Sequence, residues 1–173
     1  QANCAACSDT ALAKMASLEL TLERLFKEQQ LDGLALSSDS GAQARHGIAF
    51  EASLSMVATG GLLATGPADV YGALSMALQR AALREDEPPV SVELAMRHPE
   101  QRNLVLVRAR HGAALSLAAD ADAVILREQD ALAALVGADK AQGAYEFALK
   151  PGAVTLCRLA EVGGQFHMWI AAG

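Results

Sequence analysis

The stretch that most constrains the fold is residues 62–76, which read LLATGPADVYGALSM. This pattern predicts a short apolar strand, a Gly-Pro turn and an Asp at the start of a helix. In open α/β sheets, ligands collect at the carboxyl ends of strands, where the amino ends of helices point. Two interpretations of Asp69 stay open: it caps the helix, or it holds a metal ion or a substrate.

The first half of the chain predicts helices alternating with short buried strands. An amphipathic helix is expected over residues 9–30, because apolar side chains recur there at helical spacing. Strands are expected over residues 33–37 and 62–65, one helix is expected to start around His46 and Glu51 and to run to about Thr59, and another is expected over residues 69–83. Residues 38–41 favour a loop, and His46 lies near the start of the second helix. The order αβαβα implies parallel strands with right-handed crossovers.

The composition changes at residues 84–89, where four charged residues precede two prolines. Alternating apolar positions and Gly-rich turns follow, which is typical of antiparallel hairpins. The predicted strands cover residues 90–94, 103–107, 123–126, 144–149, 153–159 and 165–170, with a short helix over 129–136. The predicted fold is α/β (residues 1–87) followed by mainly antiparallel β (residues 88–173). These halves are interpreted as part of a parallel α/β sheet domain and a β-barrel-like domain.

Charge and hydropathy exclude two classes of partner. The net charge is −6, no basic cluster occurs, and 4% of the residues are aromatic, which argues against a nucleic-acid groove. No apolar run reaches the roughly 18 residues of a membrane-spanning helix. Nothing resembles a secretory leader, so a cytoplasmic location is expected.

Three cysteines are present, and two of them, Cys4 and Cys7, form a CxxC motif; the third is Cys157. A zinc site needs two further ligands at a comparable spacing, and a second CxxC is absent. Structural thiols are therefore the favoured interpretation. A redox or metal module built on Cys4 and Cys7 remains an alternative.

Two carboxylates are candidates for chemistry, because Glu51 and Asp69 each lie where a helix is predicted to begin. If the two predicted strands are neighbours in a parallel sheet, both acids project over the same edge. Two converging carboxylates suit a hard divalent cation such as Mg²⁺ or Mn²⁺. The alternative is that both acids are surface or helix-capping residues.

Three segments resemble the L-fucose isomerase and L-arabinose isomerase superfamily. They are DVYGALSM at residues 69–76, FEASL at residues 50–54 and KPGAVTLCRL at residues 150–159. The last is similar to a hairpin of that family's C-terminal β domain, and the order of the segments also agrees. The resemblance spans most of the chain.

The resemblance implies that Glu51 and Asp69 are both catalytic residues and metal ligands, of Mn²⁺ or Mg²⁺. In that family the ion grips two adjacent sugar oxygens, and acids beside it move a proton between C1 and C2. An aldose and a ketose then interconvert without an organic cofactor. The implied partner is a small-molecule sugar, and the implied assembly is a homo-oligomer.

The chain begins at Gln1 and ends at Gly173 directly after an apolar strand. We therefore interpret it as a fragment of a sugar isomerase-like protein, comprising the end of the α/β domain and part of the β domain. The isolated chain is expected to be inactive. The alternative is a non-catalytic sugar-binding or assembly module that retains the isomerase fold.

Overall fold

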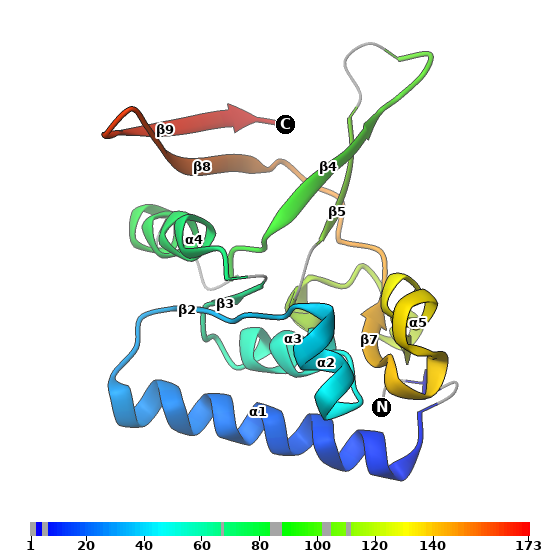
Figure 1. Cartoon of the computed structure of the whole chain (residues 1–173). Coiled ribbons are helices and arrows are strands. Elements are labelled where there is room, and N and C mark those ends of the chain that lie inside the picture. The colour runs from blue at the N-terminus through cyan, green and yellow to red at the C-terminus, as the bar shows by residue number, and fades with distance from the viewer. Residues whose placement is uncertain (1–2, 5–6, 67, 84–87, 102–104, 110–111) are drawn as a thin grey trace.

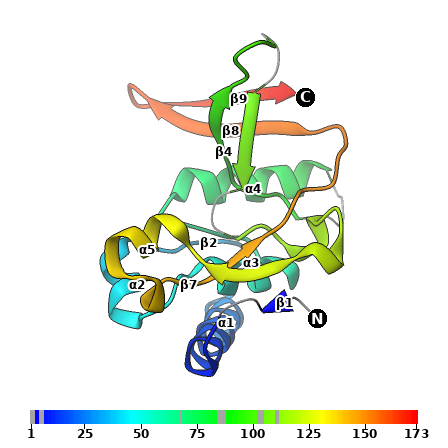
Figure 2. The same ribbon diagram turned by 90° about the vertical axis from the view of Figure 1, so that its right-hand side faces the viewer.

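The computed structural model describes residues 3–4, 7–66, 68–83, 88–101, 105–109 and 112–173. Helix α1 runs along one side of the molecule, and α2, α3 and α5 form the layer above it (Figure 1). Helix α4 lies above this layer, and the β8–β9 hairpin lies on the far side of α4 (Figure 2). The helices are α1 (Asp9–Gln29), α2 (Ser40–His46), α3 (Glu51–Thr59), α4 (Val70–Leu83) and α5 (Asp130–Val136), with short 3₁₀ turns η1 (Leu115–Leu117), η2 (Ala121–Ala123) and η3 (Ala138–Lys140).

The described strands form four small sheets. The strands are β1 (Asn3–Cys4), β2 (Leu34–Ala35), β3 (Ala64–Thr65), β4 (Val92–Arg97), β5 (Val105–Ala109), β6 (Ile125–Glu128), β7 (Gln142–Glu146), β8 (Thr155–Val162) and β9 (Gln165–Ala172). Strands β2 and β3 pair in parallel, as predicted. The pairs β4–β5, β6–β7 and β8–β9 are antiparallel, and β1 adds to β6 in parallel.

The mixed α/β class with antiparallel pairs in the second half is therefore confirmed. The described strands do not close into a barrel, so the β-barrel-like domain stays a prediction. Residues 84–87, on which the predicted boundary partly rests, lie outside the described residues. The two-domain division also stays a prediction.

Helix α1 follows directly from its sequence. The Ser8 side chain accepts a hydrogen bond from the Ala11 backbone at 3.2 Å, which caps the helix start. Met15, Leu22 and Phe26 are buried at helical spacing on one face. The helix ends at Gln29, one residue before the predicted end.

The main hydrophobic core lies between α1 and α3. Leu54 and Val57 of α3 are fully buried, and Phe26 of α1 packs in the same cluster. Leu126 of β6 and Tyr145 of β7 complete it from the second half of the chain. The core that supports the parallel strand pair is therefore built from both halves of the sequence.

The loop predicted over residues 38–41 is correct only as far as Asp39, because helix α2 begins at Ser40. Asp39 caps this helix by accepting a hydrogen bond from the Ala42 backbone at 2.9 Å. Gly47 ends it with a left-handed φ of 68°. His46 is thus the last residue of α2 and does not begin the following helix. Small polar residues favour loops and helix caps alike, which explains the error.

Candidate functional site

Glu51 and Asp69 each stand at the start of a helix that is connected to the β2–β3 pair. Asp69 follows β3 and immediately precedes α4. Helix α3 begins at Glu51, ends at Thr59 and leads into the amino end of β3, and its nine residues span roughly 13 Å. That both acids project over one edge of the sheet, and that they share an ion, both stay predictions.

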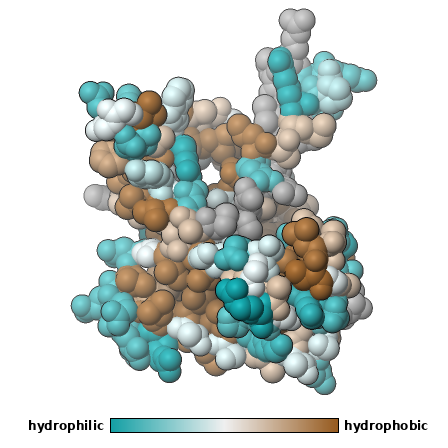
Figure 3. Space-filling model, in the orientation of Figure 1, coloured by the Kyte–Doolittle hydropathy of each residue, from teal (hydrophilic) through white to brown (hydrophobic). Residues whose placement is uncertain are grey.

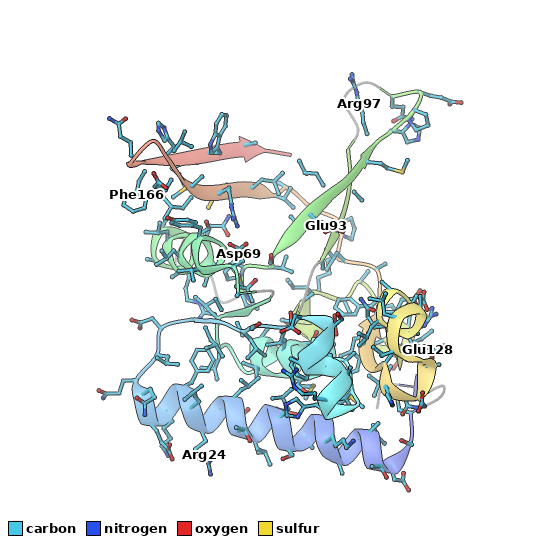
Figure 4. All side chains as sticks on the ribbon, viewed as in Figure 1. Arg24, Asp69, Glu93, Arg97, Glu128 and Phe166 are labelled. Carbon is cyan, nitrogen blue, oxygen red and sulfur yellow. The ribbon has the colours of Figure 1, made fainter. Side chains whose placement is uncertain are left out.

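Asp69 caps helix α4 and is held by an arginine from the far end of the sequence. Its Oδ1 atom accepts a hydrogen bond from the Gly72 backbone at 2.8 Å. Arg158 of β8 donates from Nη1 to Oδ2 at 2.6 Å and from Nη2 to Oδ1 at 3.0 Å. These bonds to Asp69 are the largest cause of the raised pKa of the Arg158 guanidinium. Figure 4 shows Asp69 beside helix α4, below strand β8 of the hairpin.

The bidentate Asp69–Arg158 pair leaves little room around it. A Cβ atom on Gly72 would overlap the Asp69 carboxylate and would lie 3.2 Å from Arg158 Nη1. The residue before Asp69, Ala68, has a φ of 52°, which is uncommon for a residue with a side chain. Its backbone N–H donates to the Leu36 carbonyl at 2.8 Å, which ties the turn to the segment following β2. Local geometry therefore fixes where the Asp69 carboxylate points.

Further contacts dock strand β8 along helix α4. The Ser75 hydroxyl donates to the Tyr71 carbonyl at 2.6 Å and accepts from the Leu159 backbone at 2.8 Å. The Gln79 side chain donates to the Thr155 carbonyl at 3.2 Å. Burial raises the pKa of the Cys157 thiol, which keeps it protonated near neutral pH. Backbone groups of β8 that are not used by β9 thus find partners on α4.

Glu51 is positioned by the first turn of α3. An acidic side chain there interacts favourably with the positive end of the helix dipole. Its Oε2 atom is shielded from solvent. The buried Gln43 side chain donates to the Ser38 carbonyl at 2.8 Å and accepts from the Phe50 backbone at 3.0 Å. Gln43 therefore ties the segment that follows β2 to the residue that precedes Glu51.

Replacing Gln43 with methionine is expected to lower the free energy of unfolding by about 2 kcal/mol, because two buried backbone groups lose their partners while the volume changes little. Urea unfolding measures the difference. Gln165→Met on the exposed strand β9 is the matched control and is expected to change little. Equal stability of the two variants would contradict the bridging role of Gln43.

The histidines and cysteines that the structure describes form no group of three with Glu51 or Asp69 that could hold a metal ion. His46 is exposed and its ring meets that of Phe50 edge-on, with the ring centres 5.6 Å apart. His167 lies on the exposed strand β9, opposite Ala160. Cys7 is partly buried against the main core, and the Cys4 side chain lies outside the described residues.

The described residues do not fit a complete metal site. Among them, no three His, Cys, Asp or Glu side chains form a group able to hold an ion. The Asp69 carboxylate already accepts two bonds from a guanidinium and one from a backbone N–H. Glu51 and Asp69 supply at most part of a ligand set. The predicted Mn²⁺ or Mg²⁺ stays a prediction.

A shallow, open stretch of surface lies on the outer face of α1, away from Asp69. Alanine, serine, threonine and leucine line it together with Arg24, whose place on the molecule Figure 4 shows. Its lining includes no acid, histidine or cysteine, so it does not provide ligands for a metal ion.

Sequence reasoning did not assign a role to Arg158, Ser75 or Gln43. Arg158 and Ser75 lie within two of the segments that resemble the isomerase superfamily, residues 150–159 and 69–76. That resemblance is the sequence feature that could have drawn attention to them. No sequence pattern points to Gln43, because this residue lies between the predicted loop and the predicted start of the second helix.

No protein-family model matches the chain, and no curated protein or solved structure matches it either. Among the described residues, the helices lack the combination of length and apolar character needed to cross a bilayer.

Proposed function

We propose that the chain is part of a sugar isomerase-like protein, in which the edge formed by Glu51 and Asp69 binds an aldose or a ketose. One observation carries this proposal. The two segments with the most specific resemblance, residues 69–76 and 150–159, are about 80 positions apart in sequence and pack against each other. Arg158 pairs with Asp69, and Leu159 donates to Ser75.

The proposed chemistry uses carboxylates as acceptors and as proton carriers. Adjacent hydroxyl groups of a sugar donate hydrogen bonds to carboxylate oxygens at this edge. A carboxylate takes the proton from C2 while the carbonyl oxygen at C1 gains a proton, which gives the enediol. Return of a proton to C1 and loss of the proton from the C2 hydroxyl give the ketose. Protons are conserved, and no organic cofactor is required.

A divalent ion at this edge requires ligands beyond the described residues. The parent protein therefore supplies them from other segments or from another subunit.

The β-barrel-like domain, the homo-oligomeric state and the cytoplasmic location belong to the same proposal. Light scattering of the purified chain measures the oligomeric state directly.

Binding of the sugar is tested with L-fucose, L-arabinose and the corresponding ketoses by saturation-transfer NMR in the presence of Mg²⁺. Asp69→Asn and Glu51→Gln are each expected to weaken binding about tenfold or more, because a charged acceptor becomes neutral and each lost charge-assisted hydrogen bond is worth about 1.5–3 kcal/mol. Asn also caps helices well, so Asp69→Asn preserves the start of α4.

The matched controls are Asp130→Asn and Glu28→Gln, which remove the same charge on α5 and α1. They are expected to leave sugar binding unchanged. Absence of binding by the unmodified chain, or equal binding by all four variants, would overturn the proposal.

A non-catalytic sugar-binding or assembly module is the second candidate. The Asp69–Arg158 pair favours it, because a carboxylate held by a guanidinium is a weaker base than a free one. Deuterium exchange at C2 of the bound sugar in D₂O separates the two candidates. Exchange supports the isomerase, and binding without exchange supports the module.

A further inference from the structure

Strand β9 is an edge strand without the usual protection against pairing. Its eight residues are all exposed, and within the described part of the chain it pairs with β8 alone. Natural edge strands are blunted by lysine, proline, a β-bulge or a short length. The sequence of β9, QFHMWIAA, contains no Lys, Arg, Asp, Glu or Pro, and its register with β8 is unbroken over eight pairs. A long, uncharged edge of this kind is a template for another strand.

The opposite edge of the hairpin is covered by helix α4. The Leu159 N–H of β8 donates to the Ser75 hydroxyl at 2.8 Å. The Thr155 carbonyl accepts from the Gln79 side chain at 3.2 Å. Figures 1 and 2 show β8 facing α4 and β9 on the far side of β8. The free edge of the hairpin is therefore turned away from the helix.

The backbone ladder shows which groups lie on this free edge. Val154 and Gly173 exchange both backbone hydrogen bonds, at 2.8 and 3.0 Å. Such pairs alternate with pairs that exchange none, so residues 165, 167, 169 and 171 of β9 bond to β8. The N–H and C=O groups of the even-numbered residues point away from β8. These residues are Phe166, Met168, Ile170 and Ala172.

The side chains of this strand are apolar and accessible. The exposed fraction is 70% for Phe166 and Trp169 and 71% for Ile170. Figure 3 shows hydrophobic side chains on the surface of the part of the molecule that holds the hairpin and α4. Each chain has a net charge of −6, so two copies repel each other where their acids meet. The uncharged β9 strand is a place where two copies approach without that repulsion.

We propose that β9 binds a second copy of this chain, with the two β9 strands paired antiparallel about a two-fold axis beside Trp169. A two-fold axis makes one surface meet itself, so residue i faces residue j and residue j faces residue i. Only one register gives all four outward residues a partner. In it Phe166 faces Ala172, and Met168 faces Ile170. Trp169 then faces its own counterpart, and the two hairpins form one four-stranded sheet.

This register is self-complementary in size and in charge. The large Phe166 meets the small Ala172, and Met168 and Ile170 meet each other. Trp169 lies in a pair without backbone hydrogen bonds, in which the Cα atoms are about 4.5 Å apart and the side chains approach closely. Aromatic pairs across strands stabilise beyond the area that they bury. One strand from each copy makes a small interface, so a weak, concentration-dependent dimer is expected.

This inference gives the proposed homo-oligomeric state a contact surface, and it does not require sugar binding. Sedimentation velocity of the whole chain, from micromolar to millimolar concentration, is expected to show a monomer–dimer equilibrium.

The first test removes one outward backbone donor from β9. Met168→Pro is expected to weaken the dimer about tenfold or more, because the symmetric interface loses two hydrogen bonds while those to β8 remain. Proline is tolerated in an edge strand where the N–H faces solvent. Thr155→Pro is the matched control, because the same alternation places the Thr155 N–H on the opposite edge of the hairpin. It is expected to leave dimerisation unchanged, and circular dichroism checks that both variants keep the fold.

The second test reads the register directly. Trp169→Cys is expected to join two copies through a disulfide on oxidation with diamide, because a Cα separation of about 4.5 Å lies within the disulfide range. His167→Cys is the control. It would face Ala171, so the two introduced thiols would lie about 14 Å apart along the strands and are not expected to join. Both variants keep the three native cysteines, so these do not account for a difference.

The outcomes separate this inference from the proposed function. A chain that stays monomeric at millimolar concentration would overturn the inference. A dimer that Met168→Pro does not weaken, or in which Trp169→Cys crosslinks no better than His167→Cys, would overturn it as well. If the dimer forms through β9 while sugar binding fails, the inference stands and the sugar proposal falls. Sugar binding by a monomeric chain gives the reverse result.

Discussion

Replacing Leu54 with alanine is expected to lower the free energy of unfolding by about 3 kcal/mol, within the range for buried leucines. Leu54 is 0% exposed and belongs to the cluster between α1 and α3. Its surroundings are tight, because a Cβ atom on Gly112 would lie only 2.7 Å from the Leu54 Cβ. Urea unfolding followed by circular dichroism measures the change.

Leu20→Ala is the control for Leu54→Ala, because Leu20 lies on α1 with 65% of its surface exposed. It is expected to change stability by less than about 0.5 kcal/mol, as surface substitutions usually do. A loss of equal size at both positions would show that the core is not where the structure places it.

Replacing Gly143 with alanine is expected to cost about 3 kcal/mol or more, because backbone strain and steric overlap act together. Gly143 of β7 has a φ of 122°, which side-chain-bearing residues rarely adopt. An added Cβ would lie 2.6 Å from the Ala49 carbonyl oxygen and 2.9 Å from the Met15 sulfur. The Ala49 carbonyl belongs to the backbone that leads into α3, so it cannot move aside cheaply. Thermal unfolding of the purified variant measures the loss.

Gly152→Ala provides the comparison, because an added Cβ at Gly152 meets no atom within 4 Å. Its stability is expected to stay within about 0.5 kcal/mol of the unmodified chain. If Gly143→Ala were equally harmless, the close approach of β7 to residue 49 would be wrong.

Glu51 and Asp69 differ in how many buried contacts fix the segments that carry them. Glu51 begins a helix whose other residues are mostly buried, and Gln43 fixes its amino end through two buried hydrogen bonds. Asp69 instead faces a hairpin that contacts the molecule mainly through α4. We therefore expect substitutions in the core that disturb Glu51 to lower the free energy of unfolding as well. Changes at Arg158 are expected to act on Asp69 with little loss of stability, because partly exposed ion pairs contribute about 1 kcal/mol or less.

Much of the secondary structure followed from local patterns. The helix predicted over residues 9–30 is found at Asp9–Gln29, and the one predicted over 69–83 is found at Val70–Leu83. The strands predicted over residues 153–159 and 165–170 are the β8–β9 hairpin, joined at Gly163 and Gly164 as the turn residues indicated. In each case periodic apolar side chains and a cap or turn residue point to the same element.

Local patterns failed where a short segment depends on distant partners. Helix α2 has seven residues, and its buried Gln43 bonds to the segments on either side of it. The pairing of β1 with β6 joins residues more than 120 positions apart, which periodicity does not reveal. Short helices and two-residue strands gain most of their stability from tertiary packing, so their sequences carry weak signals.

The sequence by itself determined that Asp69 would stand at the start of a helix after a strand, and that the second half would form antiparallel pairs. Both depend on neighbours within a few residues, through capping, turns and alternation. Only the tertiary structure decided that Arg158 would hold Asp69 and that residues of β6 and β7 would complete the core between α1 and α3. These contacts join parts of the chain that are far apart in sequence, and they exist only once packing has brought the elements together.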